Sequence, residues 1–185
     1  MTVHSHINSL FNSMSYVFNG ILIDPGDVWN GFNNVSIVLL THAHFDHIYG
    51  LNELLMISPT AKVYTNVIGK EMLLNARKNL SAYHETPFVL EYPESVVIVN
   101  DRETVDLGNG LTAKVVFTPG HNSSCISWII DNMVFSGDSL IPGVKTATNL
   151  PGGDKEESKR SEKLIRQLII NRDIFPGHQV LTRNL

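Results

Sequence analysis

The sequence predicts a mixed α/β protein, and three observations support this class. Short β-branched and apolar runs recur along the chain, and three longer segments carry apolar residues at helical spacing. The order is strands, then helices, then strands, then a helix, which indicates mixed layering and not a strict alternation of strand and helix. The length of 185 residues suits one domain, residues 1–185, with a core large enough to need no disulfide.

Two hairpins and several further strands are predicted. The first hairpin joins residues 13–18 to 20–24 through an N-G dipeptide, which favours a tight hairpin turn, and the second turns at a D-N dipeptide. The run V-S-I-V-L-L-T at residues 35–41 is β-branched and apolar, which is typical of a buried strand. The other predicted strands cover residues 61–65, 95–100, 111–118, 125–131 and 133–136.

Three helices are predicted from apolar residues that recur every three to four positions, at residues 46–57, 67–79 and 155–170. The first must stop before Pro59, which cannot continue a helix. The charged residues at the start of the third predicted helix are expected to form its solvated face. The polar stretch 146–157 is predicted to be a surface loop.

Composition excludes several classes of protein. Apolar residues make up 43% and charged residues 17%, so the chain is globular, and no apolar run approaches the length of a membrane span. The first eleven residues lack a secretory-signal pattern, and the single Cys125 excludes an internal disulfide. The net charge of −4 comes without a basic patch, so no nucleic acid partner is expected. We expect a cytoplasmic protein that acts on a small molecule, with no membrane partner and an undefined oligomeric state.

The heptapeptide T-H-A-H-F-D-H at residues 41–47 carries the first chemical signal. His42 and His44 are two positions apart, so an extended backbone directs both imidazoles to the same side, an arrangement that suits zinc. Asp46 and His47 fall where the next helix begins and can face the same cavity. Two alternatives stay open: Asp46 is an N-cap of that helix, or the whole heptapeptide is an exposed polar loop.

Three later segments repeat one pattern, in which a strand end is followed by a glycine turn and then by His or Asp. They read T-P-G-H at 118–121, S-G-D-S at 136–139 and P-G-H at 176–178. Loops at strand ends are where a rigid scaffold presents ligands. Each segment alone says little, but all of them in this order after the heptapeptide indicate a metal site.

With these motifs the chain resembles the metallo-β-lactamase-fold hydrolase superfamily, and within it the glyoxalase II-like branch. The resemblance covers nearly the whole chain and includes I-D-P-G at 23–26 and L-P-G-G-D at 150–154. It implies an αβ/βα four-layer sandwich, in which two mixed β-sheets face each other with helices outside and metals at one edge.

The resemblance also implies a binuclear site for two divalent metal ions, zinc first, with iron or manganese as alternatives. Asp138 is implied to bridge both ions, and Asp46 and Asp138 are the expected catalytic carboxylates. Asp24 is implied to support the site, and a plain turn residue is the alternative. The implied ligands are His42, His44 and His121 for the first ion, and Asp46, His47 and His178 for the second.

The chemistry of such a site agrees with hydrolysis. Seven ligands are one too few for two separate tetrahedral sites, but sharing Asp138 and one bridging hydroxide completes both. Two cations about 3.5–4 Å apart lower the pKa of that water to near 7. The predicted function is therefore a binuclear metal-dependent hydrolase of a thioester or small ester, similar to hydroxyacylglutathione hydrolase, with the bridging hydroxide as nucleophile.

Two departures from the glyoxalase II pattern, and one difference from metallo-β-lactamases proper, bear on the substrate and the metal. The chain ends shortly after P-G-H, so the helical region that completes the glutathione pocket of larger glyoxalase II enzymes is not expected here. The branch usually shows G-R-T-D where residues 146–149 read T-A-T-N, so Ala147 and Asn149 replace an Arg and an Asp. In metallo-β-lactamases proper the Asp138 position usually holds Cys or Ser, which argues against an antibiotic-hydrolysing enzyme.

Two other functions stay open. One is an iron-dependent persulfide dioxygenase of the same superfamily, whose members often carry a Cys near the Cys125 position, although a small buried residue is the simpler interpretation there. The other is a metal-binding protein without turnover. Tyr83 and His84, in A-Y-H-E-T-P at 82–87, are candidate substrate contacts, with an ordinary surface loop as the alternative.

Overall fold

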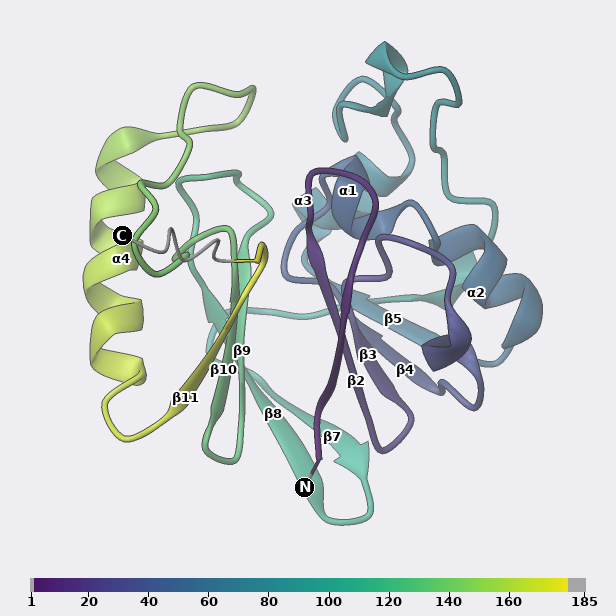
Figure 1. Ribbon diagram of the computed structural model, residues 1–185, viewed down its shortest axis with the longest axis horizontal. Coiled ribbons are helices and arrows are strands. Elements are labelled where there is room, and N and C mark those ends of the chain that lie inside the picture. Colours follow the sequence, from purple (N-terminus) through teal and green to yellow (C-terminus); the bar gives the residue numbers. More distant parts are fainter. Residues whose placement is uncertain (1, 180–185) are drawn as a thin grey trace, which may run out of the picture.

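The N-terminal half of the chain builds the first of two β-sheets in the computed structural model, which describes residues 2–179 (Figure 1). The first three strands pair antiparallel, and the later ones join the sheet in parallel. In spatial order, which is also chain order, the strands are β1 (His4–Ile7), β2 (Met14–Phe18), β3 (Ile21–Ile23), β4 (Ile37–Leu39), β5 (Lys62–Thr65) and β6 (Val96–Ile98).

The C-terminal half builds the second sheet (Figure 1). Its first four strands form an antiparallel meander, and the last strand pairs in parallel with its neighbour. The strands are β7 (Thr104–Gly108), β8 (Leu111–Phe117), β9 (Ile126–Ile130), β10 (Met133–Gly137) and β11 (Asp173–Pro176). Both sheets are therefore mixed, as predicted.

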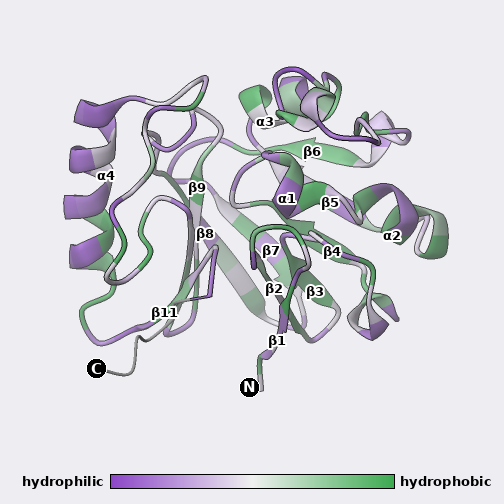
Figure 2. Ribbon diagram, turned by 45° about the horizontal axis from the view of Figure 1, so that its top comes forward, coloured by the Kyte–Doolittle hydropathy of each residue, from purple (hydrophilic) through white to green (hydrophobic). Residues whose placement is uncertain are grey.

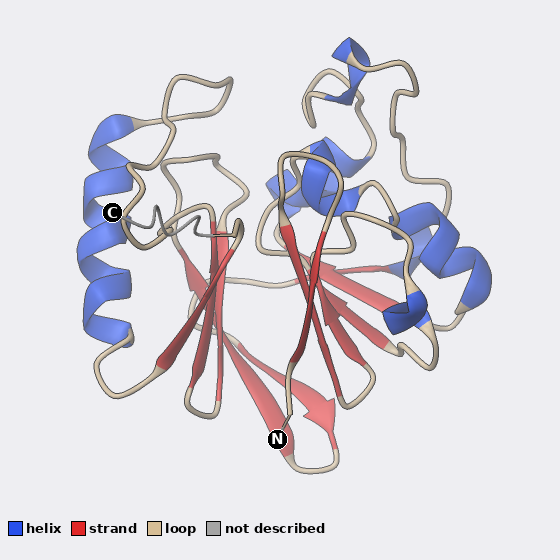
Figure 3. Ribbon diagram, viewed as in Figure 1, coloured by secondary structure: helices blue, strands red, loops and turns tan. Residues whose placement is uncertain are grey.

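Helices cover the outer faces of the two sheets (Figure 3). The α-helices are α1 (Phe45–Ile48), α2 (Leu51–Ile57), α3 (Val67–Leu73) and α4 (Lys155–Leu168), and short 3₁₀ helices lie at Asn30–Phe32, Ser81–Tyr83 and Pro93–Ser95. Helix α4 lies outside the second sheet, and α1 to α3 lie outside the first. The predicted αβ/βα sandwich is confirmed. Within residues 2–179, no helix has the length and apolarity that crossing a bilayer requires.

Two apolar clusters hold these layers together. One fills the space between the sheets, and the other packs α1 to α3 against the first sheet. Trp128 is fully buried in the first cluster, and its Nε1 donates to the Leu40 carbonyl at 2.9 Å across the two sheets. Helix α4 shows hydrophilic residues on its outer turns (Figure 2) and buries Ile165.

Two predicted helices differ from the structure. The helix expected at 46–57 is interrupted between α1 and α2, because the Gly50 amide donates to the Pro25 carbonyl and a Cβ there would lie 2.8 Å from the Asp27 backbone. The helix expected at 67–79 ends at Leu73, because the side chain of Asn75 accepts from the amides of residues 77 and 78 and starts a turn.

Candidate metal centre

The carboxyl ends of four strands meet at one edge of the sandwich (Figure 1). The motif residues follow β4, β8, β10 and β11, and the loops after these strands meet around the same cavity. The residues that follow these four strand ends are His42, His121, Asp138 and His178. His44 comes two residues after His42, and Asp46 and His47 lie in α1.

The first group of donors consists of His42, His44 and His121, whose ligand atoms lie within 4.8 Å of one another. Nδ1 of His44 is 2.9 Å from Nε2 of His121, so one ring donates a hydrogen bond to the other. The Thr41 hydroxyl donates to Asp24 and therefore accepts from Nδ1 of His42 at 3.2 Å. This bond leaves Nε2 of His42 with its lone pair free, and that atom has no partner within residues 2–179.

The second group consists of Asp46, His47 and His178. Oδ2 of Asp46 lies 3.4 Å from Nε2 of His47 and 3.4 Å from Nε2 of His178. Each imidazole is anchored from behind, since Nδ1 of His47 donates to Asp24 at 3.0 Å and Nδ1 of His178 donates to the Phe11 carbonyl at 2.9 Å. Such bonds at the far nitrogen fix the tautomer and aim Nε2 at the centre.

Asp138 lies between the two groups. Its Oδ2 is 3.5 Å from Nε2 of His121 and 3.3 Å from Nε2 of His178, whereas its Oδ1 is 3.6 Å from Nε2 of His47. The carboxylate thus touches members of both groups at once. Gly177 keeps this position open, because a Cβ at that residue would lie 2.1 Å from Oδ1 of Asp138.

Asp24 is the support for this cluster. Its Oδ1 accepts from the Thr41 amide at 2.7 Å, and its Oδ2 accepts from the Thr41 hydroxyl at 2.5 Å and from His47. It can be grouped with His42 and His47 as a possible metal ligand, but its oxygens already serve these donors. We therefore assign Asp24 to orienting His47.

Burial and charge set the protonation of the cluster. Burial holds the pKa of His42 well below its usual value and lowers the pKa of His44 to about 4, so both rings are neutral. Burial opposes the charge on Asp138, but the hydrogen bond from His178 and the neighbouring His47 hold its pKa well below the usual range. Neutral imidazoles beside an ionised carboxylate are the donors that a divalent cation requires.

The geometry fits two metal ions. Donors about 2.1 Å from a tetrahedral ion are separated by about 3.4 Å, and the contacts of Asp46 and Asp138 with their imidazoles are 3.3–3.6 Å. The 2.9 Å contact between His44 and His121 would have to widen by about 0.5 Å. Three buried atoms of this cluster have no hydrogen-bond partner within the described chain, namely Nε2 of His42, Nε2 of His47 and Oδ1 of Asp138.

Neither of the two predicted substrate contacts is among the candidate metal ligands. Tyr83 is 80% exposed and does not line the cavity above the cluster. His84 does not line it either, but its ring packs against Phe45 with the centroids 4.0 Å apart. Their roles as contacts stay predictions. Cys125 is buried, and burial raises the pKa of its thiol to about 12.

A cavity of about 220 Å³ opens directly above the cluster. Sequence reasoning did not identify its apolar walls, among which Phe11 and Leu150 stand out. It also missed Asn122, whose amide lies 3.1 Å from Nε2 of His44, and the Ala147 carbonyl, which accepts from Nδ1 of His121 at 2.9 Å. No pattern of residue spacing predicts these contacts, because the partners are distant in sequence or contribute a backbone atom.

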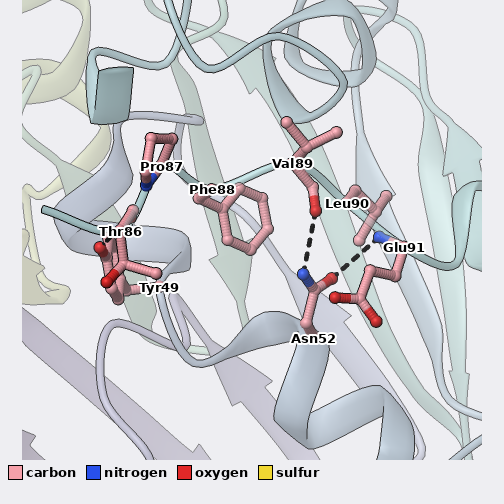
Figure 4. A pocket seen from close by; sticks show the side chains of 8 residues that line it. All are labelled: Tyr49, Asn52, Thr86, Pro87, Phe88, Val89, Leu90 and Glu91. Atoms are coloured by element: carbon pink, nitrogen blue, oxygen red, sulfur yellow. Dashed lines mark hydrogen bonds between the residues drawn. The ribbon is translucent and has the colours of Figure 1, made fainter. Parts of the chain in front are cut away.

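A larger hollow, of about 400 Å³, lies between α2 and residues 86–91 (Figure 4). The Asn52 side chain donates to the Val89 carbonyl at 2.9 Å and accepts from the Glu91 amide at 3.0 Å, which fixes one edge of the hollow. Its described lining contains no histidine or cysteine and only one carboxylate, Glu91. The metal chemistry therefore belongs to the smaller cavity.

A two-sheet sandwich with clustered imidazoles and carboxylates at one edge is a scaffold suited to binding metal ions. The sequence profile of the Metallo-beta-lactamase superfamily matches residues 32–178, and the chain belongs to that superfamily.

Relatives in sequence carry related names. The probable metallo-hydrolase YqgX of Bacillus subtilis is 35% identical over 157 residues, which cover 78% of this chain and 73% of YqgX. Glyoxylase B2 of Dictyostelium discoideum is 33% identical over 135 residues, which are 71% of this chain and 45% of that protein. The hydroxyacylglutathione hydrolase of Methylobacillus flagellatus is 26% identical over 174 residues, which are 90% of this chain and 60% of that enzyme. The chain thus spans about half the length of the last two.

Solved structures share the fold. The BLEG-1 B3 metallo-beta-lactamase superposes with a TM-score of 0.85 at 25% identity, covering 98% of this chain and 93% of that one. The di-iron-bound form of TTHA1623 gives 0.79 at 24% identity over 96% and 92% of the chains. ETHE1 from Myxococcus xanthus gives 0.72 at 22% identity over 99% and 78%. The last two establish the fold alone.

Proposed function

We propose that this chain is a binuclear metal-dependent hydrolase that cleaves a thioester or a small ester, as hydroxyacylglutathione hydrolases do. The observation that carries the proposal is the set of buried atoms Nε2 of His42, Nε2 of His47 and Oδ1 of Asp138, which lie in one cluster without a hydrogen-bond partner among the described residues. The relatives named glyoxylase B2 and hydroxyacylglutathione hydrolase support the choice of substrate bond.

Seven side chains would hold the two ions. The first ion would take its donors from His42, His44 and His121, the second from Asp46, His47 and His178, and Asp138 would serve both. When bound, the ions would supply an activated water and an electrophile for the carbonyl oxygen of the substrate. Nitrogen and oxygen donors suit zinc, which we propose first, and iron, the metal named for the structure of TTHA1623.

The protein's own residues suit a leaving group that needs no acid. In thioester hydrolysis, the oxygen of water bonds to the carbonyl carbon, the carbon–sulfur bond breaks, and a carboxylic acid and a thiol result. A thiol has a pKa near 8.5, so the thiolate leaves readily without a proton donor. Apart from the proposed metal ligands, the described lining of the cavity carries no side chain that could donate a proton, which agrees with such a reaction.

Metal analysis together with an activity panel tests the proposal. Protein purified without chelators should hold about two metal ions per chain and should hydrolyse a thioester such as S-lactoylglutathione. One iron per chain with oxygen uptake on glutathione persulfide would instead establish a dioxygenase. Hydrolysis of a chromogenic cephalosporin alone would establish a lactamase, and bound metal without any turnover would leave a binding protein.

The Asp138→Ala variant tests the shared carboxylate. Because both groups of donors contact Asp138, we expect most of the activity to be lost and the metal content to fall. Elemental analysis and the thioester assay on the same preparation measure both effects. An unchanged metal content and rate would refute the bridging assignment.

A further inference from the structure

The cavity above the candidate metal centre has a polar floor and apolar walls. The floor consists of the imidazoles and carboxylates of the ligand cluster. Half of the ten described lining residues carry apolar side chains, and these five are Phe11, Phe45, Leu80, Ala147 and Leu150. The ten include no Lys or Arg.

Phe11 forms a wall whose position is set by an unusual backbone. Its φ is 53°, in the left-handed region that bulky residues rarely adopt, and Asn12 follows with a φ of 55°. The Phe11 carbonyl accepts from Nδ1 of His178 at 2.9 Å, and the Asn12 carbonyl accepts from the Gln179 amide at 3.1 Å. One turn therefore brings a backbone carbonyl to a candidate ligand and an aromatic ring to the cavity.

The loop that carries Phe11 is tied to several segments. The amide of Ser9 donates to the Asp27 carboxylate at 2.5 Å, and the hydroxyl of Ser13 donates to the Asp46 carbonyl at 2.7 Å. A backbone conformation of this kind persists only where the surroundings fix it, and it clusters at ligand sites. The backbone that carries the Phe11 ring is thus fixed beside the cavity.

The Phe11 ring is open to solvent at the mouth of the cavity. Phe11 is 65% exposed, although its ring meets Phe45 edge-on with the centroids 5.8 Å apart. Leu150, also in the lining, is 38% exposed. An apolar group that enters the cavity would cover both and remove their surface from water, which is favourable.

We propose that the acyl half of the substrate is an uncharged apolar group, branched or aromatic, that packs against Phe11, Phe45 and Leu150 while its carbonyl faces the floor. This inference rests on the proposed hydrolysis of a thioester or ester. An acyl group that carries its own carboxylate at its far end would place that charge against apolar walls, where the described lining offers no Lys or Arg to pair with it.

A matched pair of thioesters tests the proposal on the metal-loaded protein. The phenylacetyl and succinyl thioesters of N-acetylcysteamine share their thiol and differ in the acyl group. We expect kcat/KM at least tenfold higher for the phenylacetyl compound, and we expect Phe11→Ala to reduce that preference about tenfold. Met56→Ala is the control, because Met56 is equally exposed, at 66%, but lies in α2 outside the cavity lining.

Binding of the product acids separates this inference from the proposed function. Phenylacetate should bind the loaded protein more tightly than succinate, and Phe11→Ala should weaken phenylacetate alone. If these binding results are obtained without any thioester turnover, the apolar acyl site is supported and the proposed hydrolase function is refuted. A preference for the succinyl compound or for succinate, or equal effects of Phe11→Ala and Met56→Ala, would overturn the apolar acyl site.

Discussion

Asp24 contacts the candidate centre through its hydrogen bond with His47, and we propose that it orients this ring without binding an ion itself. Its two oxygens accept from the Thr41 amide, the Thr41 hydroxyl and Nδ1 of His47. An amide in its place would keep one acceptor oxygen and turn an NH₂ group toward one of these donors. We expect Asp24→Asn to weaken metal binding about 10–100-fold, measured by competition with a chromogenic chelator.

A control for this variant exists elsewhere in the chain. Asp131 also has a left-handed backbone, with a φ of 52° against 50° for Asp24, but it lies exposed in the turn between β9 and β10. Asparagine tolerates that conformation as well as aspartate does. Asp131→Asn should therefore leave metal affinity unchanged, and equal affinities of the two variants would remove Asp24 from the site.

The protonation of His47 and His178 predicts that metal uptake releases protons. Burial lowers the pKa of His47, but Asp46, Asp138 and Asp24 outweigh it and raise that pKa to about 9. Burial likewise opposes the charge on His178, and its hydrogen bonds to Asp138 and Asp46 raise the pKa to about 10. A metal ion needs the neutral rings, so about two protons should leave per chain at pH 7.5.

Calorimetry in two buffers of different ionisation enthalpy measures this release. Metal affinity should weaken as the pH falls, since protons compete for the same nitrogens. The folding stability of the metal-free protein depends on pH in the opposite direction. Both folded-state pKa values lie above the unfolded value of 6.5, so the stabilisation from the two charged rings is complete below pH 6.5 and is lost as the pH rises through 9 and 10. Metal uptake without proton release would contradict the assignment.

At the residue scale, the sequence shows which side chains can bind metal but not what surrounds them. The histidines and aspartates stand in short motifs after strand ends, so their convergence could be predicted. The contact of the Phe11 carbonyl with His178 spans 167 positions and uses the backbone, so no residue pattern reveals it. Phe11 reads as an ordinary apolar residue in sequence, and only its φ and its place over the cavity distinguish it.

At the element scale, strands with continuous apolar runs were predictable, including β6 at the edge of its sheet, whereas strands β1 and β7 were not assigned from such runs. The buried runs of β4 and β9 lie where the sequence places them. Strands β1 and β7 lie at the edges of their sheets, where one side needs no partner, and their polar residues give no continuous apolar run. The break between α1 and α2 depends on a close approach of Gly50 to the Asp27 backbone, which apolar spacing does not report.

At the scale of the whole molecule, the site depends on how the two sheets are joined. The amide of Ile126, in the second sheet, donates to the Thr41 carbonyl at 2.7 Å, one residue before the first candidate ligand. Nearby, Nε1 of Trp128 donates to the Leu40 carbonyl at 2.9 Å. The apolar core therefore includes two polar links that set the first sheet against the second beside the cavity.

The Trp128→Phe variant tests the second of these links. Phenylalanine keeps an aromatic ring in the core but removes the donor, so the buried Leu40 carbonyl loses its partner, which costs about 1–3 kcal/mol of the free energy of unfolding. Trp29→Phe is the control, because Nε1 of Trp29 has no hydrogen-bond partner within the described residues. Removing that N–H group therefore leaves no acceptor without a partner. Urea unfolding with unchanged m-values should show the larger loss for Trp128→Phe. If both variants lose the same stability, the link between the sheets contributes nothing beyond the size of the ring.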